Sequence, residues 1–348
     1  MQIFRDIPLA PYTTLKVGGP ARYFVEAHSE SEILEALAYA GEHSLEVFVL
    51  GRGSNLVVSD AGWPGLLLKI SILGIEAAPK NGDMLFTAGA GEDWDDLVAR
   101  SVEQNCAGIE CMSGIPGTVG GTPIQNVGAY GQEVAETITT VCVIDTTSGD
   151  TREFSNFECG FLYRTSIFNT SQKGRYIVTR VSYALSPGRA PRIEYADLKR
   201  YFASSPSSPT LLQVRNAVRE IRASKAMLIT ANEENSRSAG SFFKNPIISP
   251  AEYARIASLP QCADQTPPRY PAPEGQVKVS AAWLVERAGF RKGFGNGRVG
   301  ISTKHTLAIV NRGGATAAEI VEFKNKVQQE VFKVFGVQLH PEPVFVGF

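Results

Sequence analysis

The chain has 348 residues, 43% of them hydrophobic, so it is long enough to bury a large core and to form two or three domains. Lysine and arginine number 34, and aspartate and glutamate number 35. This balance excludes the basic surface typical of a nucleic-acid-binding protein, so any anionic ligand is expected to be bound locally.

The N-terminal segment MQIFRDIPLAPYTTL lacks the cationic and apolar regions of a signal peptide, and no apolar stretch is long enough to span a membrane. The five cysteines include no C-x-x-C pair, and the four histidines are scattered. This pattern indicates reduced thiols, with no disulfide framework and no metal site. We therefore expect a cytoplasmic protein without a membrane partner.

The first half of the chain alternates predicted helices and strands, as an α+β protein does. Ser29 and Glu32 form a capping box that predicts a helix through Ala40, and Asp93 predicts the N-cap of a helix ending near Asn105. Strands are expected in the short apolar or β-branched runs 47–50, 57–58, 66–70, 84–88, 137–145, 151–154 and 176–185.

Residues 203–209 are rich in serine and proline and predict a linker, after which a second domain is expected. A strand is predicted at 307–311, and helices at 210–223, 250–258, 280–288 and 315–335. The last helix has the clearest pattern, and Gly336 provides its stop. Its apolar residues follow helical spacing: Ile320, Phe323, Val327, Val331 and Val334.

Two glycine-rich segments are the strongest functional signal. The glycine turn, LGRGSNLVVSD, follows the predicted strand 47–50, and backbone amides of residues 51–55 are suited to form an anion-binding nest. The glycine loop, Gly114–Gly131, contains six glycines and no charged residue. A loop of this length inside a compact domain is usually functional. Together the two segments suggest a dinucleotide held at both ends.

Other motifs are ambiguous when each is taken alone. Residues 295–300 match G-x-G-x-x-G, but a helix is predicted before them and a strand after them, opposite to the order of a Rossmann fingerprint. Arg164 lies among apolar residues and either binds an anion or reaches solvent. The sequence context of Ser241 is typical of a turn or helix cap. Glu342 lies between two prolines, a context typical of a solvent-exposed residue.

Seven segments in chain order resemble the UDP-N-acetylenolpyruvoylglucosamine reductase (MurB) family, over nearly the whole chain from Tyr12 to Phe348. They are TTLKVGGPARYF, LGRGSNLVVSD, GIPGTVGGTPIQNVGAYGQE, FLYRTSIF, IEYADLKRYF, SAGSFFKNP and LHPEPVF. The resemblance implies an α+β fold with an FAD-binding domain of vanillyl-alcohol oxidase (PCMH) type in two subdomains, 1–72 and 73–202, and an α+β substrate-binding domain, 210–348. Residues near 190–202 resemble the type I insert.

The resemblance also implies the site residues. Ser241, Arg164 and Glu342 fall at the family's catalytic positions. The implied substrate-binding residues are Tyr130, Tyr195, Lys225 and Asn245. The implied residues for non-covalent FAD are Gly51, Arg52, Gly53, Ser54, Asn55, Leu56, Gly114, Ile115, Pro116, Gly117, Thr118, Gly120, Gly121, Gln125, Asn126, Gly128 and Ala129. No metal is implied.

The implied reaction is reduction of the enolpyruvyl group of a UDP-sugar to a lactyl ether, for peptidoglycan synthesis. NADPH first reduces the flavin, and the two substrates then use one pocket in turn. Arg164 would stabilise charge that develops on the substrate carboxylate, and Ser241 would protonate the neighbouring carbon. Glu342 helps either as a neutral acid or by orienting a neighbour. A monomer with no nucleic-acid partner is expected.

Two other functions stay open at this stage. A flavoenzyme of the same fold with covalent FAD would need an attachment residue, and neither glycine-rich segment contains histidine or cysteine. A non-catalytic nucleotide-binding paralogue would have no need of all three catalytic residue types. The connection 226–238 departs from the family pattern, because it is longer, lacks proline and carries Glu233 and Glu234. This departure bears on the placement of Lys225.

Overall fold

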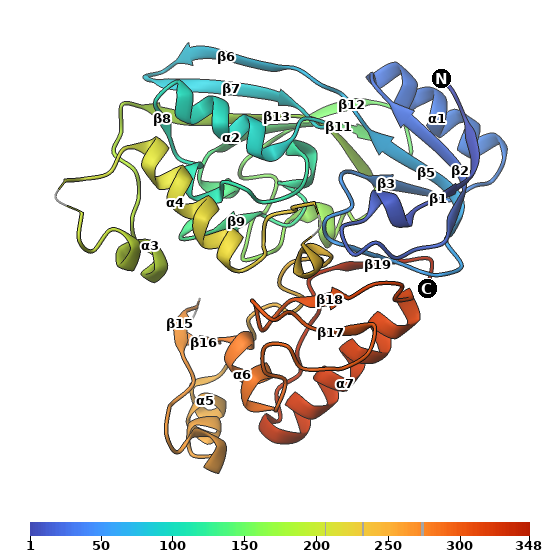
Figure 1. Cartoon of the computed structure of the whole chain (residues 1–348). Coiled ribbons are helices and arrows are strands. Elements are labelled where there is room, and N and C mark those ends of the chain that lie inside the picture. Colours follow the sequence, from blue (N-terminus) through green and yellow to red (C-terminus); the bar gives the residue numbers. More distant parts are fainter. Residues whose placement is uncertain (206, 232, 273–274) are drawn as a thin grey trace. The chain divides into compact units, whose positions relative to one another are not determined.

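A computed structural model describes residues 1–205, 207–231, 233–272 and 275–348, and the chain divides into two compact units (Figure 1). Unit 1 consists of Met1–Ile7, Ala21–Gly53 and Pro64–Leu228. Unit 2 consists of Pro8–Pro20, Ser54–Trp63 and Ile229–Phe348. Both units mix helices with strands, which confirms the expected α+β class. The division into 1–72, 73–202 and 210–348 stays a prediction.

A four-stranded sheet forms the N-terminal part of unit 1. Its strands lie in the order β1 (Phe4–Pro8), β2 (Pro20–Ala27), β5 (Trp63–Ile70) and β3 (Val47–Leu50). Helix α1 (Glu30–Glu42) connects β2 to β3, and Oγ of Ser29 accepts a hydrogen bond from the N–H of Glu32 as the sequence predicts. Strands β3 and β5 are parallel, so the glycine turn begins at the carboxyl end of a parallel strand.

A six-stranded antiparallel sheet forms the rest of the core of unit 1. Its order is β12 (Thr151–Ser155), β11 (Ile138–Asp145), β13 (Tyr176–Pro187), β7 (Asp83–Gly89) and β6 (Ile75–Lys80), with β8 (Cys106–Ala107) also paired to β13. Helix α2 (Trp94–Glu103) begins at the predicted N-cap Asp93, and Trp94 and Leu97 are buried in the same core as Phe86 and Tyr183.

Two further helices of unit 1 are α3 (Ala196–Tyr201) and α4 (Leu211–Ser224). We expected α4 to begin the second domain, but its apolar face packs within unit 1. Val214 and Val218 are buried against Leu198 of α3 and Cys111, and Leu211 packs against Val102. Helical periodicity predicts that a face is buried without identifying the partner, which explains the difference.

Unit 2 contains α5 (Pro250–Ala257), α6 (Ala281–Arg287) and α7 (Ala317–Phe335). Its strands pair as β14 (Ile247–Ile248), β16 (Val277–Val279) and β15 (Arg269–Pro271), as β17 (Val299–Ile301) with β18 (Ile309–Asn311), and as β19 (Val344–Val346) with β4 (Leu56–Val58). Thr316 and Glu319 form a capping box on α7, and the predicted C-terminal Gly336 has φ of 67°.

Short elements complete the chain. Strands β9 (Gly128–Ala129) and β10 (Gln132–Glu133) form a hairpin at the end of the glycine loop. The 3-10 turns are Ala10–Tyr12, Glu110–Met112, Val119–Gly121, Val134–Glu136, Ile167–Asn169, Glu234–Ser236 and Pro260–Cys262. Residues 295–300 follow α6 and include the first two residues of β17, so the prediction that this G-x-G-x-x-G segment lacks Rossmann geometry is confirmed.

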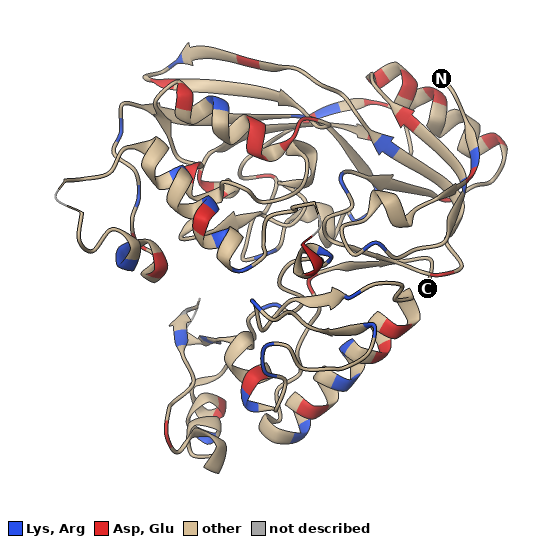
Figure 2. Ribbon diagram, in the orientation of Figure 1, with Lys and Arg blue, Asp and Glu red and all other residues tan. Residues whose placement is uncertain are grey.

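Charges of both signs are interspersed along the elements of both units, in line with their nearly equal totals (Figure 2). Within the described ranges, no helix combines the length and the apolar composition needed to cross a membrane. All five cysteines are free, and burial raises the pKa of Cys159 to about 12. The described residues also hold no group of histidine, cysteine and carboxylate side chains suited to a metal.

Candidate active site

The glycine turn begins directly after β3, and its first three residues belong to unit 1. Gly53 has φ of 62°, a left-handed conformation that favours glycine. Gly51 lies so close to Thr118 that a Cβ on Gly51 would lie 2.9 Å from Oγ1 of Thr118. Arg52 forms an ion pair with Asp93, the N-cap of α2. The glycine turn and the glycine loop are therefore neighbours in unit 1.

The remaining residues of the turn, Ser54, Asn55 and Leu56, belong to unit 2. Nδ2 of Asn55 donates a hydrogen bond to the carbonyl of Glu342 at 3.3 Å, and the N–H of Val344 donates to the carbonyl of Asn55 at 2.9 Å. Leu56 begins β4, which pairs with β19. Asn55 therefore connects the turn to the segment that carries Glu342.

The glycine loop runs beside the segment that leads into α2. Three backbone hydrogen bonds join them, from Trp94 N–H to Gly117 C=O at 3.2 Å, from Val119 N–H to Glu92 C=O at 2.9 Å, and from Gly120 N–H to Ala90 C=O at 2.9 Å. A Cβ on Gly120 would lie 2.6 Å from Cβ of Ala90. This close approach of two backbones explains why glycine is needed there.

The loop presents a surface that fits a large, flat, partly apolar group. It has no charged side chain, and four of its apolar residues pack on the core of unit 1 while remaining partly exposed: Ile115, Ile124, Val127 and Ala129. Backbone amides near glycine suit phosphate groups, and partly exposed apolar side chains suit a ring system. The residues present therefore fit FAD.

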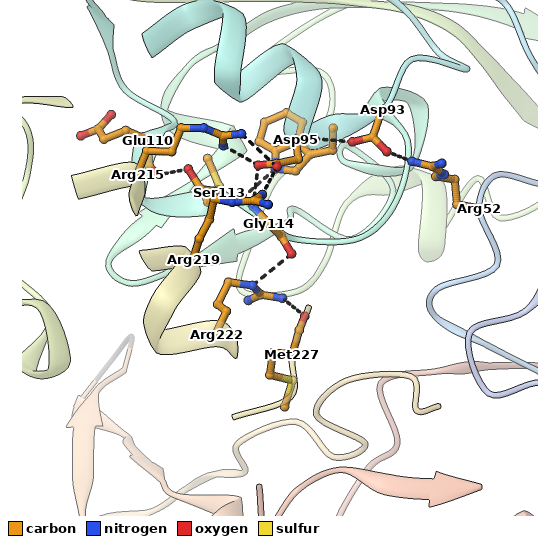
Figure 3. Close-up of polar contacts among 12 residues, drawn as sticks. Arg52, Asp93, Asp95, Glu110, Ser113, Gly114, Arg215, Arg219, Arg222 and Met227 are labelled. Atoms are coloured by element: carbon orange, nitrogen blue, oxygen red, sulfur yellow. Dashed lines mark hydrogen bonds and ion pairs between the residues drawn. The ribbon is translucent and has the colours of Figure 1, made fainter. Parts of the chain in front are cut away.

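A carboxylate and three arginines hold the start of the glycine loop (Figure 3). Oδ1 of Asp95 accepts a hydrogen bond from the N–H of Gly114 at 2.6 Å, and Arg215 and Arg219 of α4 both form ion pairs with Asp95. Nε of Arg222 donates to the carbonyl of Gly114 at 3.1 Å. Both polar backbone groups of Gly114 are thus bound by side chains.

Arg164 points toward the end of the glycine loop. Its Nη2 donates to the carbonyl of Gly128 at 2.8 Å and its Nη1 to that of Asn126 at 3.4 Å, and its own backbone has φ of 54°. Asn126 is buried, and its side-chain amide donates to Glu133 and to the carbonyl of Leu162. Two backbone carbonyls of the glycine loop therefore orient the guanidinium.

Three of the predicted substrate-binding residues lie together in unit 1. The rings of Tyr130 and Tyr195 meet edge to face with centroids 5.4 Å apart, and Nζ of Lys225 lies 5.8 Å from the centroid of Tyr130. Nζ of Lys225 also donates to Oδ2 of Asp197 at 2.7 Å. Burial is the main cause that raises the pKa of Tyr130 to about 12, so this phenol is neutral.

Ser241 and Glu342 lie on adjacent segments of unit 2. The N–H of Glu342 donates to the carbonyl of Phe242 at 2.9 Å, and Phe243 forms a β-bridge with Pro341. Both site residues are half-buried, while Phe242 and Phe243 fill the core below them. The third predicted residue of this unit, Asn245, accepts a hydrogen bond from the N–H of Ala281 at the start of α6.

The structure shows which residues balance the charge of Glu233 in the connection 226–238 before Ser241. Glu233 caps the 3-10 turn Glu234–Ser236 and forms an ion pair with Lys304. The hydrogen bond from Lys304 is the main cause that lowers the pKa of Glu233 to about 2. Its negative charge is therefore balanced within unit 2. Lys225 itself is the C-cap of α4, so its position is set by that helix rather than by the longer connection.

Sequence reasoning missed the residues that support the glycine loop. The apolar periodicity of α4 carries no information about its charged face, so no role was predicted for Asp95. A signal was present: Arg215, Arg219 and Arg222 have the i, i+4, i+7 spacing of one helix face, which indicates a common partner. Asp197, the partner of Lys225, was missed because the two residues are far apart in sequence.

Comparisons with known proteins agree with this geometry. Residues 21–155 match the family described as FAD binding domain, and residues 232–346 match the UDP-N-acetylenolpyruvoylglucosamine reductase C-terminal domain. The solved structure of UDP-N-acetylenolpyruvylglucosamine reductase (MurB) from Thermus caldophilus aligns with a TM-score of 0.65 and 25% identity, over 99% of this chain and 98% of that one. The expected α+β fold with an FAD-binding domain is thereby confirmed.

Full-length relatives carry the same name. A UDP-N-acetylenolpyruvoylglucosamine reductase of Thermobifida fusca is 45% identical over 99% of this chain and 98% of its own length. That of Streptomyces coelicolor is 44% identical over 100% of this chain and 91% of its own length. The chain therefore belongs to the UDP-N-acetylenolpyruvoylglucosamine reductase family.

Proposed function

We propose that this chain reduces the enolpyruvyl group of UDP-N-acetylenolpyruvoylglucosamine to the lactyl ether, with NADPH as reductant and FAD as cofactor. The product is UDP-N-acetylmuramate, a precursor for peptidoglycan synthesis. The observation that carries the proposal is the match to reductases of this name over the full chain, together with two neighbouring glycine-rich segments suited to a dinucleotide.

FAD is held by the glycine turn and the glycine loop in this proposal. Gly51 and Gly53 provide backbone approach to the pyrophosphate, and Ile115 and Ile124 provide apolar surface. These residues would hold FAD, which would supply hydride transfer from NADPH to the substrate double bond. The absence of histidine and cysteine from both segments supports a non-covalent attachment.

Arg164 is the proposed electrostatic catalyst. Hydride addition to the vinyl ether places negative charge on the substrate carboxylate, and a guanidinium held by backbone carbonyls is a preorganised partner for that charge. The guanidinium also lies 5.4 Å from the ring centroid of Tyr163, a contact that further fixes its position. Its left-handed backbone conformation directs the side chain toward the glycine loop.

Ser241 is the proposed proton donor to the neighbouring carbon, with Glu342 beside it. A serine hydroxyl is a weak acid, so its deprotonated oxygen needs a nearby cation, and Lys244 in the same segment supplies one candidate. The backbone bond between Glu342 and Phe242 keeps the glutamate next to the serine segment. In this position Glu342 orients a neighbour or acts as a neutral acid.

Tyr130, Tyr195, Lys225 and Asn245 are the proposed substrate-binding residues. Lys225 offers a positive charge for the diphosphate, and the two tyrosine rings beside it offer apolar faces and hydroxyl donors. We further propose residues 1–72, 73–202 and 210–348 as domains, a monomeric state and a cytoplasmic location. The free thiols and the soluble nucleotide substrate support the last point.

Purification and turnover test the function together. The protein should be yellow, and heat or acid should release the flavin. NADPH should be oxidised beyond about one equivalent per flavin only when the enolpyruvyl UDP-sugar is present, and the product should gain two hydrogen atoms by mass spectrometry. Flavin that reduces with NADPH but ignores the UDP-sugar would indicate another oxidoreductase of this fold. Colourless protein that binds UDP would indicate a non-catalytic paralogue.

A further inference from the structure

We propose that Asp95 is a positioning residue for the cofactor: by holding the N–H of Gly114, it fixes the start of the glycine loop in the conformation that FAD requires. This role rests on the proposed function only in that the loop binds FAD. Asp95 does not contact the reacting atoms, and its effect passes through the backbone.

Both carboxylate oxygens of Asp95 accept hydrogen bonds from neighbouring residues (Figure 3). Oδ1 accepts from Gly114 N–H at 2.6 Å and from Nη1 of Arg215 at 2.5 Å, and Oδ2 accepts from Nη2 of Arg215 at 3.0 Å. Arg219 also donates to Oδ2. The side chain of Asp95 is 18% exposed and that of Arg215 is 13% exposed. The carboxylate is thus charged, mostly buried and bound to one backbone amide.

Gly114 is the residue of the glycine loop at which hydrogen bonds to the backbone should restrict the loop most. Its φ of 71° is a left-handed conformation, and a Cβ there would lie 2.5 Å from Cδ2 of Leu228. Glycine is therefore required at position 114. Glycine also loses more backbone conformational freedom than any other residue when its conformation is fixed. Asp95 holds the N–H of Gly114, and Arg222 holds its carbonyl at 3.1 Å. The peptide groups on both sides of a flexible residue are therefore fixed.

The same carboxylate sits where the loop is joined to the rest of unit 1. Nε1 of Trp94, the residue before Asp95, donates to the carbonyl of Met112 at 3.0 Å, and the N–H of Trp94 donates to Gly117. Asp93 accepts from the N–H of Asp95 and pairs with Arg52 of the glycine turn. The first turn of α2 thereby contacts the chain before, at and after Gly114.

Preorganisation explains why this support should matter for cofactor affinity. A flexible loop loses conformational entropy when it becomes ordered around a ligand, and this loss weakens binding. The loss is smaller when the loop is already ordered before the ligand binds. A loop with six glycines has a large conformational freedom unless neighbouring residues restrict it. Removing Asp95 should therefore weaken FAD binding without altering the chemistry of bound FAD.

The experiment compares FAD affinity in the variants Asp95→Ala and Asp95→Asn. The dissociation constant is measured from the flavin fluorescence released when holoenzyme is diluted, well below the unfolding temperature. We expect Asp95→Ala to raise it about tenfold to a hundredfold, the range for a lost hydrogen bond to a charged group. Asp95→Asn should have a smaller effect, because its amide oxygen still accepts from Gly114. At saturating FAD, kcat should stay near the wild-type value.

Two controls separate positioning from general stability. Arg215→Met removes an ion pair but keeps the bond from Gly114 to Asp95, so it should lower Tm with little change in FAD affinity. Asp264→Ala removes a similar carboxylate, bound by two nitrogens of Arg287 in unit 2, and should leave FAD affinity unchanged. Hydrogen exchange of the peptide that contains Gly114 should accelerate in Asp95→Ala and in neither control.

The results that overturn the proposal are specific. They are an FAD dissociation constant within twofold of wild type in Asp95→Ala, or an equal loss of affinity in Arg215→Met. If Asp95→Ala does not fold, unchanged affinity and unchanged exchange in Asp95→Asn contradict the proposal instead. A wild-type protein that binds no FAD refutes the proposed function itself, which is a different result from FAD that binds wild type and Asp95→Ala equally.

Discussion

Gly51 lies in contact with Thr118: a Cβ on Gly51 would lie 2.9 Å from Oγ1 and 3.7 Å from Cγ2 of the threonine. Gly51 does not have a positive φ, so room rather than backbone conformation accounts for the glycine. The contact joins the glycine turn to the glycine loop.

Gly51→Ala should therefore weaken FAD binding and lower stability by about 1–3 kcal/mol, the range for overpacking. Gly41→Ala is the matched control, because Gly41 lies in α1 and a Cβ there meets nothing within 4 Å. That control should raise stability by about 0.5–1 kcal/mol through helix propensity. Thermal unfolding and FAD titration measure both effects. Equal stability of the two variants would show that the contact relaxes freely.

Ser241→Ala should affect only one half of the catalytic cycle. Flavin reduction by NADPH should keep its normal rate, because no proton is delivered to substrate carbon in that step. Reoxidation by the UDP-sugar should slow by roughly 10² to 10⁴, the usual contribution of a positioned acid. Stopped-flow absorbance of the flavin follows each step separately.

Ser238→Ala provides the control for this test, because Oγ of Ser238 accepts from the N–H of Gly240 in the same turn. It should lower stability by about 1 kcal/mol and leave both half-reactions unchanged. If Ser241→Ala behaves like Ser238→Ala, Ser241 has only a structural role.

Asp197→Asn should tighten binding of the UDP-sugar. The carboxylate of Asp197 lies 2.7 Å from Nζ of Lys225, where it neutralises the charge proposed to bind the diphosphate. Because this pair is partly exposed, the gain should be modest, about two- to fivefold in KM, with kcat unchanged. Glu220→Gln removes a negative charge nearby but keeps an oxygen that accepts from the hydroxyl of Tyr201, so it should leave KM at the wild-type value. A higher KM in Asp197→Asn would mean that Asp197 orients the lysine instead.

The contribution of the Asp95 carboxylate to the stability of the fold should decrease at low pH. Burial raises the pKa of this carboxyl group, but the bonds from Arg215 and Gly114 lower it more, so it lies below its ordinary value of 3.8. A lowered folded-state pKa gives stability that is present above the unfolded value and lost as pH falls through the folded value. The Tm difference between wild type and Asp95→Asn should thus be constant above about pH 5 and shrink below about pH 4. A constant difference down to about pH 3 would contradict the shift.

Local signals in the sequence predicted the helices well, because a cap acts on neighbouring residues. The caps at Ser29 and Asp93 and the stop at Gly336 are confirmed by side-chain or backbone geometry. The strand pairing was not predictable in the same way. Asn55 and Glu342 are bonded across a separation of 287 residues, and no local pattern encodes that pairing.

The candidate site shows the same division. The glycine-rich segments could be predicted as ligand-binding segments, because few structural roles other than ligand binding account for their composition. Their mutual contact through Gly51 and Thr118 needed the structure. Arg164 was ambiguous in sequence, and its bonds to Gly128 and Asn126 show that it lies against the glycine loop rather than reaching only for solvent. The catalytic roles of Arg164, Ser241 and Glu342 stay predictions.

The pairing of β4 with β19 also sets an order of events during synthesis. Residues 56–58 leave the ribosome long before their parallel partner at 344–346 is made. At about 5–20 residues per second, β4 waits on the order of tens of seconds for that partner. A nascent chain can therefore complete the sheets of unit 1 first, while the strand that follows the glycine turn stays without its partner until residues 344–346 are made. Deleting residues 344–346 should leave that strand without this partner permanently.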